Sequence, residues 1–160
     1  MKHSHHARAI AAGLLLLATM LPPARGEPTE DAPAAAARDP DYAAGKAAME
    51  QKDWAEALRR LLQAVVRDPD SADLQNDLGY VYRNLGQMPA ALRHYERAIE
   101  LNPRHRGAHE YVGEAYLMLG DLPNAEKHLA ALRRICLLPC EEVTHLEQAI
   151  RQHRLRSSAR

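Results

Sequence analysis

Apolar residues along this chain fall into three regimes. A 13-residue apolar run, from Ala9 to Leu21, stands near the start, and residues 27–38 then mix Pro, Ala and acids without any period. From Asp39 onward, apolar positions recur with the spacing of amphipathic helices. The pattern therefore predicts a leader, a disordered linker and an all-α domain, in that order.

The apolar run is typical of a secretory signal peptide. Basic residues precede it, and its length is well below the ~20 residues that span a bilayer. The small residues Ala24 and Gly26 suit cleavage before Glu27. An uncleaved membrane anchor is the alternative, which the shortness of the run disfavours. We therefore expect residues 1–26 to be removed and the mature chain to be periplasmic or secreted, without a membrane attachment.

The helical region repeats itself at an offset of 34 residues. Three columns of equivalent positions result: Gly45, Gly79 and Gly113; Ala57, Ala91 and Ala125; and Leu61, Tyr95 and Leu129. Self-similarity of this length is typical of stacked helical hairpins, none of which buries its apolar face alone. Because a mid-helix Gly costs about 1 kcal/mol relative to Ala, we expect close helix approach at each glycine, with the alanines as the facing residues.

Residues 75–103 carry the clearest motif, which reads Leu78-Gly79-x2-Tyr82, Gly86, Ala91-x3-Tyr95, Ala98 and Pro103. On these residues the chain resembles the tetratricopeptide repeat family. The resemblance implies a right-handed superhelix of three helical hairpins plus a C-terminal capping helix. The expected boundaries are 39–70, 71–104 and 105–138 for the repeats, 139–156 for the capping helix and 157–160 for a tail. The first repeat matches least, since Ala48 stands where the family has Tyr.

The resemblance implies that the first helix of each repeat, at roughly 40–52, 72–85 and 105–119, lines a concave groove. Tyr42, Tyr80 and Tyr111 fall one on each of these helices, and Tyr is enriched where proteins bind one another. Packing between neighbouring helices explains them equally well. The predicted partner-binding residues are Tyr42, Lys46, Asn76, Asp77, Tyr80, Arg83, Asn84, Glu110, Tyr111 and Glu114.

Acidic groups outnumber basic groups along the predicted groove. Asp73, Asp77, Glu110 and Glu114 stand against Lys46 and Arg83, which favours a partner segment that carries Lys or Arg. A solvated acidic face without any ligand is the alternative. Family members that hold a peptide's C-terminal carboxylate use Lys, Asn and Arg at defined groove positions. Those positions here carry Tyr42, Lys46, Gly107 and Tyr111, so that carboxylate-binding site is not expected.

The two cysteines, Cys136 and Cys140, flank Pro139 between the last repeat and the capping helix. Two proximal thiols form a disulfide by default in the oxidising compartment that a signal peptide implies. We therefore predict a bridge that fixes this corner. The alternative is a carrier site for zinc or cuprous copper, formed by both thiols with His145, either with or without His128. Redox catalysis is disfavoured because no C-x-x-C motif is present.

Composition narrows the class of function further. Removing residues 1–26 leaves 18 basic against 21 acidic residues, so the mature chain lacks the cationic surface that nucleic-acid binding needs. No Gly-rich phosphate loop, Gly-x-Ser-x-Gly turn or His-Glu-x-x-His pair occurs. We predict a non-enzymatic scaffold or adaptor without a cofactor, which binds a peptide segment of another protein in the groove.

Overall fold

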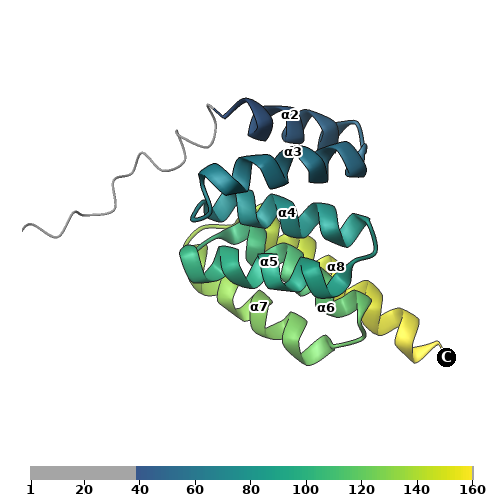
Figure 1. The fold of residues 1–160 in the computed structure, drawn as a ribbon. Coiled ribbons are helices and arrows are strands. Elements are labelled where there is room, and N and C mark those ends of the chain that lie inside the picture. Colours follow the sequence, from purple (N-terminus) through teal and green to yellow (C-terminus); the bar gives the residue numbers. More distant parts are fainter. Residues whose placement is uncertain (1–38, 160) are drawn as a thin grey trace, which may run out of the picture.

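The computed structural model describes residues 39–159, so the predicted signal peptide and linker lie outside the described residues. This part of the chain is entirely helical, with helices that stack in one curved array (Figure 1). The helices are α2 (Pro40–Glu50), α3 (Trp54–Arg67), α4 (Ala72–Asn84), α5 (Met88–Leu101), α6 (Arg106–Met118), α7 (Leu122–Ile135) and α8 (Glu141–Ser158). None of these described helices combines the length and the apolar character that crossing a lipid bilayer requires.

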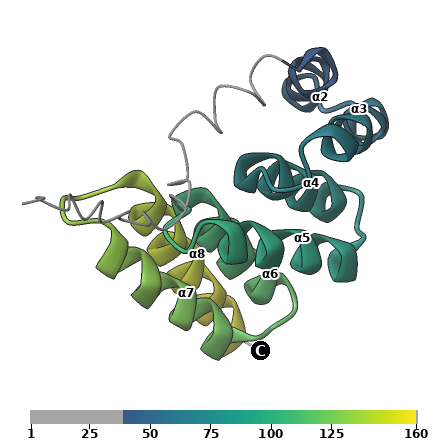
Figure 2. The ribbon, with the colours of Figure 1, turned by 60° about the vertical axis from the view of Figure 1, so that its left-hand side comes forward.

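Tight turns pair the helices into three hairpins, α2–α3, α4–α5 and α6–α7, which stack with a superhelical twist (Figure 2). Each of these turns holds a residue in the left-handed region at the same repeat position: Lys52, Gly86 and Gly120, with φ of 59°, 74° and 78°. Side-chain caps then start two of the three following helices, α3 and α7, whereas α5 has none. Asp53 and Asp121 each accept a hydrogen bond from a backbone N–H in the first turn.

Close approach occurs at each glycine of the 34-residue column, as predicted. A Cβ atom added to Gly79 would lie 2.6 Å from Cδ1 of Tyr95, and one added to Gly45 would lie 2.6 Å from Cδ2 of Leu61. The nearest side chains are therefore the large residues of the third column, and the expectation that alanines face the glycines is wrong. A missing Cβ makes room for a bulky side chain, which buries more apolar area than an alanine does.

The last repeat is closed by α8. At Gly113 the nearest side chain is Leu146 of α8, 2.6 Å from an added Cβ atom, instead of Leu129 of the same column. Leu146 and Ile150 are both buried, in a cluster with apolar residues of α6 and α7. Burial of one such side chain stabilises the fold by about 1.5 to 3 kcal/mol, an upper estimate since unfolded chains already bury some surface.

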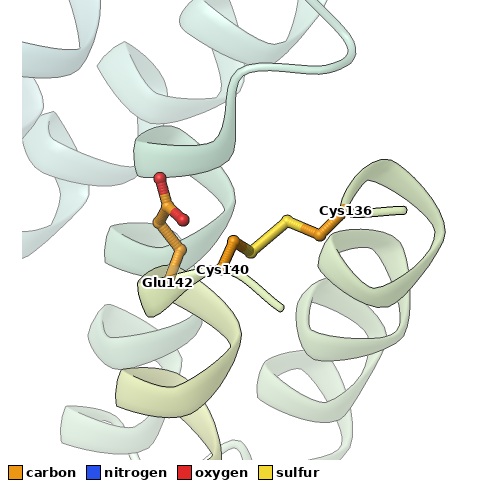
Figure 3. Close-up of side chains that lie close together, drawn as sticks. All are labelled: Cys136, Cys140 and Glu142. Carbon is orange, nitrogen blue, oxygen red and sulfur yellow. A yellow bond between two sulfur atoms is a disulfide. The ribbon is translucent and has the colours of Figure 1, made fainter. Parts of the chain in front are cut away.

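A disulfide joins the last repeat to α8. Cys136 is the C-cap of α7 and Cys140 is the N-cap of α8, and their sulfur atoms are bonded across a Cα–Cα distance of 6.2 Å (Figure 3). The bridge predicted from the sequence is thus present. It ties the end of one helix to the start of the next.

Candidate interaction groove

Polar side chains connect α2, α4, α6 and α8 in order, so that these helices form one continuous face. Between α2 and α4, the Tyr42 hydroxyl donates to Oδ2 of Asp77 at 2.8 Å, and Nζ of Lys46 lies 3.1 Å from the same oxygen. Between α6 and α8, Nδ1 of His145 lies 3.0 Å from Oε1 of Glu110. We call this face the groove.

The first part of the groove is occupied by the carboxylate of Asp77, which belongs to this chain. It is buried, and burial raises its pKa although Lys46 and Tyr42 act in the opposite direction. Burial and the charge of Asp77 likewise raise the pKa of Tyr42 above its ordinary value. Since the Lys46 ammonium already pairs with Asp77, it is not free to hold the carboxylate of a peptide.

A cluster of aromatic rings around Arg83 forms the middle of the groove. The guanidinium carbon of Arg83 lies 5.1 Å from the ring centre of Tyr80 and 5.4 Å from that of Tyr111. The two rings are 5.1 Å apart, and Arg83 also pairs with Glu114 at 2.6 Å. These tyrosines therefore pack against one another, and both remain partly exposed.

Several of the predicted partner-binding residues are largely buried. Asn76, Asp77 and Glu110 expose only 6 to 7% of their surface, so a partner can reach little of them. Asn84 is exposed and donates from Nδ2 to the Tyr80 carbonyl oxygen at 2.8 Å. Lys46, Asn84 and the partly exposed Glu114 remain the reachable polar groups.

The predicted negative charge of the groove is compensated in part within the chain. Asp77 pairs with Lys46 and Glu114 with Arg83, whereas Asp73 and Glu110 lie against His105 and His145, which carry charge only when protonated. A partner's basic side chain would have to compete with these groups. The preference for Lys or Arg in the partner therefore has a weaker physical basis than the sequence suggested.

A hollow of about 350 Å³ opens where the C-terminal ends of α4 and α6 meet α8. Its apolar lining comes from Leu117, Met118 and Ala149, and its polar lining includes Arg83 and Glu114. Met118 is 64% exposed, which is unusual for a large apolar side chain in a concavity. The contribution of α8 was missed from the sequence because the 34-residue register does not extend to that helix.

The alternative prediction was a metal carrier, and the residues predicted to bind the metal contact other groups instead. Cys136 and Cys140 are bonded to each other, His145 contacts Glu110, and His128 contacts a second histidine. In the described part of the chain, the one group with metal-ligand proximity joins both sulfurs to a Glu142 oxygen within 4.8 Å (Figure 3). The disulfide withholds the thiolates that zinc or copper would need.

A repeated network of histidines lies between the hairpin helices and was missed from the sequence. His94 stacks on Tyr82, and His128 stacks on Tyr116. These two His–Tyr pairs are related by the 34-residue offset. In the last repeat, Nδ1 of His128 lies 3.0 Å from Nδ1 of His109. Their common offset was the available signal, and the contacts indicate a role in packing.

Stacked helical hairpins with a continuous inner face and a closing helix define a helical-repeat domain. The tetratricopeptide repeat family matches residues 42–92 and 76–136, together more than half of the chain. The chain belongs to the tetratricopeptide repeat family. The all-α repeat superhelix predicted from the sequence is thereby confirmed. A comparison with curated proteins gives no match.

Solved structures share the fold. The TPR2B domain–pHsp70 complex of yeast Sti1 has a TM-score of 0.64 at 20% identity, over 70% of this chain and 94% of that chain. PcrH in complex with the chaperone binding region of PopD has a TM-score of 0.65 at 21% identity, over 73% and 90%. The translocator chaperone SycD of Yersinia enterocolitica has 0.67 at 18% identity, over 73% and 91%. At these identities the likeness concerns the fold alone.

Proposed function

We propose that this chain is an exported, non-enzymatic scaffold. Its groove holds a short segment of a partner protein. The observation that carries the proposal is the half-apolar hollow at the end of the groove, with Met118 exposed inside it. Solved structures of the same fold include a complex with pHsp70 and one with the chaperone binding region of PopD, which supports binding of a partner segment. The signal-peptide pattern of residues 1–26 supports export.

The lining of the hollow favours a partner segment anchored by one large aliphatic or aromatic side chain. Leu117, Met118 and Ala149 offer apolar contact, and Asn84 and Gln152 offer hydrogen bonds to a peptide backbone. Arg83 is held between two tyrosine rings and Glu114, so the polar wall is already ordered before binding. An ordered wall lowers the entropic cost of binding.

Site-specific photocrosslinking in the source cells tests the proposal. A photoreactive amino acid at Met118 should crosslink a partner, whereas the same group at Val66, which is 81% exposed on α3, should not. Met118→Glu should weaken co-purification of that partner by at least about tenfold, a loss of about 1.4 kcal/mol, and Val66→Glu should not. Crosslinks of equal yield at both positions, or at neither, would contradict groove binding.

Metal carriage is a second candidate function. It applies only to the chain in which the disulfide has been reduced. Glu142 lies beside the two sulfurs, and its Oε2 is buried without a hydrogen-bond partner among the described residues. Competition with a chromogenic zinc chelator, before and after treatment with a phosphine reductant that supplies no thiol of its own, measures this function. Stoichiometric zinc uptake only after reduction, lost in Glu142→Gln, supports it, and absence of uptake in the reduced chain discards it.

A further inference from the structure

The disulfide closes a ring of five residues that holds two leucines in solvent. Leu137 and Leu138 expose 90% and 80% of their surface, side by side, between the C-cap of α7 and the N-cap of α8. Adjacent exposed aliphatic side chains of this size mark interaction sites. Because the disulfide fixes the loop at both ends, its leucines lose little freedom on contact with a partner.

A hollow of about 440 Å³ lies between this loop and the turn from α5 to α6. Ile135, Pro139 and the two leucines form its apolar wall. Arg104 and Arg106 form the opposite wall.

The two arginines leave positive charge at the hollow. Arg104 has no carboxylate within ion-pair distance among residues 39–159, and its guanidinium donates only to the Ile135 carbonyl oxygen, at 3.4 Å. Arg106 reaches Glu142 through Nε at 3.3 Å. Glu142 is thus already paired, Glu141 is exposed at the start of α8, and Arg104 keeps its charge for a ligand.

We propose that the hollow beside the disulfide loop is a second docking site, which binds an acidic segment of a partner protein. In this arrangement a large apolar side chain of the partner packs against Leu137 and Leu138, and an adjacent carboxylate pairs with Arg104. Charge complementarity selects the acid, and the exposed leucines select its apolar neighbour. Arg134, exposed at the end of α7, adds positive charge near the loop, whereas Arg133 pairs with Glu147 at 2.8 Å.

The proposed docking site is separate from the groove. The loop precedes the first residue of α8, whereas the groove hollow is lined by Ala149, Gln152 and Arg156 further along that helix. At 1.5 Å per residue, the nine residues from Cys140 to Ala149 span roughly 13 Å. Figure 2 shows the loop at the opposite end of α8 from the C-terminus. One chain can therefore hold two partner segments at once.

Selection from a random-peptide library displayed on phage tests this site directly. The library is panned on the oxidised chain and counter-selected on the Leu137→Ser, Leu138→Ser double variant. Enriched peptides should combine Asp or Glu with a neighbouring Leu, Ile, Phe or Trp. By fluorescence anisotropy, Arg104→Glu should weaken their binding by at least about tenfold, and added salt should weaken it further. Failure to enrich any peptide, or enrichment of basic peptides, would overturn the proposal.

Control variants separate this proposal from its competitors. Both leucines are exposed, so the double variant should unfold at the same temperature as the wild type. Met118→Glu should leave the selected peptides bound, since that residue lines the groove hollow and not this one. The last control experiment is flotation with phosphatidylglycerol vesicles, which tests for binding to a lipid surface. Vesicle binding that requires the two leucines would assign the loop to a lipid surface and contradict a protein partner.

Discussion

The tautomers of the histidine pair in the last repeat follow from its hydrogen bonds. Nε2 of His109 lies 3.2 Å from the Pro103 carbonyl oxygen, so this nitrogen carries the proton and Nδ1 is left as an acceptor. His128 must then donate from its own Nδ1, at 3.0 Å. Burial, and the neighbouring His109, lower the pKa of His128 to about 4. Protonating His109 at Nδ1 would remove the acceptor and break the pair.

Acid should therefore destabilise the fold through this pair. The unfolded chain takes up a proton on His128 near the ordinary pKa of 6.5, and the folded chain excludes that proton until about pH 4. The contribution of His128 is full above about pH 6.5 and is lost progressively between these values. His128→Gln does not titrate, so its urea-unfolding free energy should fall less from pH 7 to pH 5. We expect a difference on the order of 1 kcal/mol, because partial exposure screens the effect.

The comparison between variant and wild type isolates His128 from other titrating groups. Burial raises the pKa of Asp77 and Glu110 and lowers that of His94, but both proteins share these groups. Their effects on the pH dependence cancel in the difference. Identical pH profiles for the two proteins would show that titration of His128 does not contribute to the acid sensitivity of the fold.

The groove residues illustrate how far single residues could be predicted. Helical periodicity and the family register predicted Tyr80, Arg83 and Glu114 on one face, and in the structure Arg83 contacts both of the others. Their pairing was not predicted, although Arg83 and Glu114 are 31 residues apart, close to one repeat length. Composition counted the acids and bases of the groove but could not show that neighbouring repeats pair them.

At the scale of helices, the contact of α4 with α5 depends on the absence of a side chain at Gly79. Tyr95 is fully buried and lies against the Gly79 backbone. A methyl group there meets Cδ1, Cε1 and Cγ of the ring at 2.6 to 3.0 Å, and a rigid ring in a packed core cannot yield easily. The two helices would have to separate.

Gly79→Ala should therefore destabilise the protein. Overpacking costs about 1 to 3 kcal/mol, and the gain in helix propensity offsets up to about 1 kcal/mol of it. Gly107→Ala, in α6, is the matched control, since the nearest atom to its added Cβ lies at an ordinary 3.5 Å. The control should be neutral or slightly stabilised. Thermal unfolding of both variants measures the effect, and equal midpoints would show that α4 and α5 adapt without cost.

For the whole molecule, the 34-residue columns were enough to predict the stacked hairpins, because each repeat contacts mainly its neighbours. They could not predict how the stack ends. Leu146 occupies the place against Gly113 that Leu61 and Tyr95 occupy against Gly45 and Gly79, yet it comes from a helix outside the register. The last repeat thus depends on α8, and the disulfide holds that helix at its start.

Leu146→Ala should loosen the end of the stack while the beginning stays folded. Removing a fully buried leucine leaves a cavity beside Gly113 and costs about 2 to 5 kcal/mol. Because stability in stacked repeats is a sum of local and nearest-neighbour contributions, the loss should concentrate in α6, α7 and α8. Hydrogen exchange should show faster exchange in these helices and unchanged protection in α2 and α3. Leu155→Ala removes the same atoms from the exposed side of α8. It should change the hydrogen exchange of neither group of helices. Uniform loss of protection from α2 to α8 would instead show that the repeats unfold as one cooperative unit.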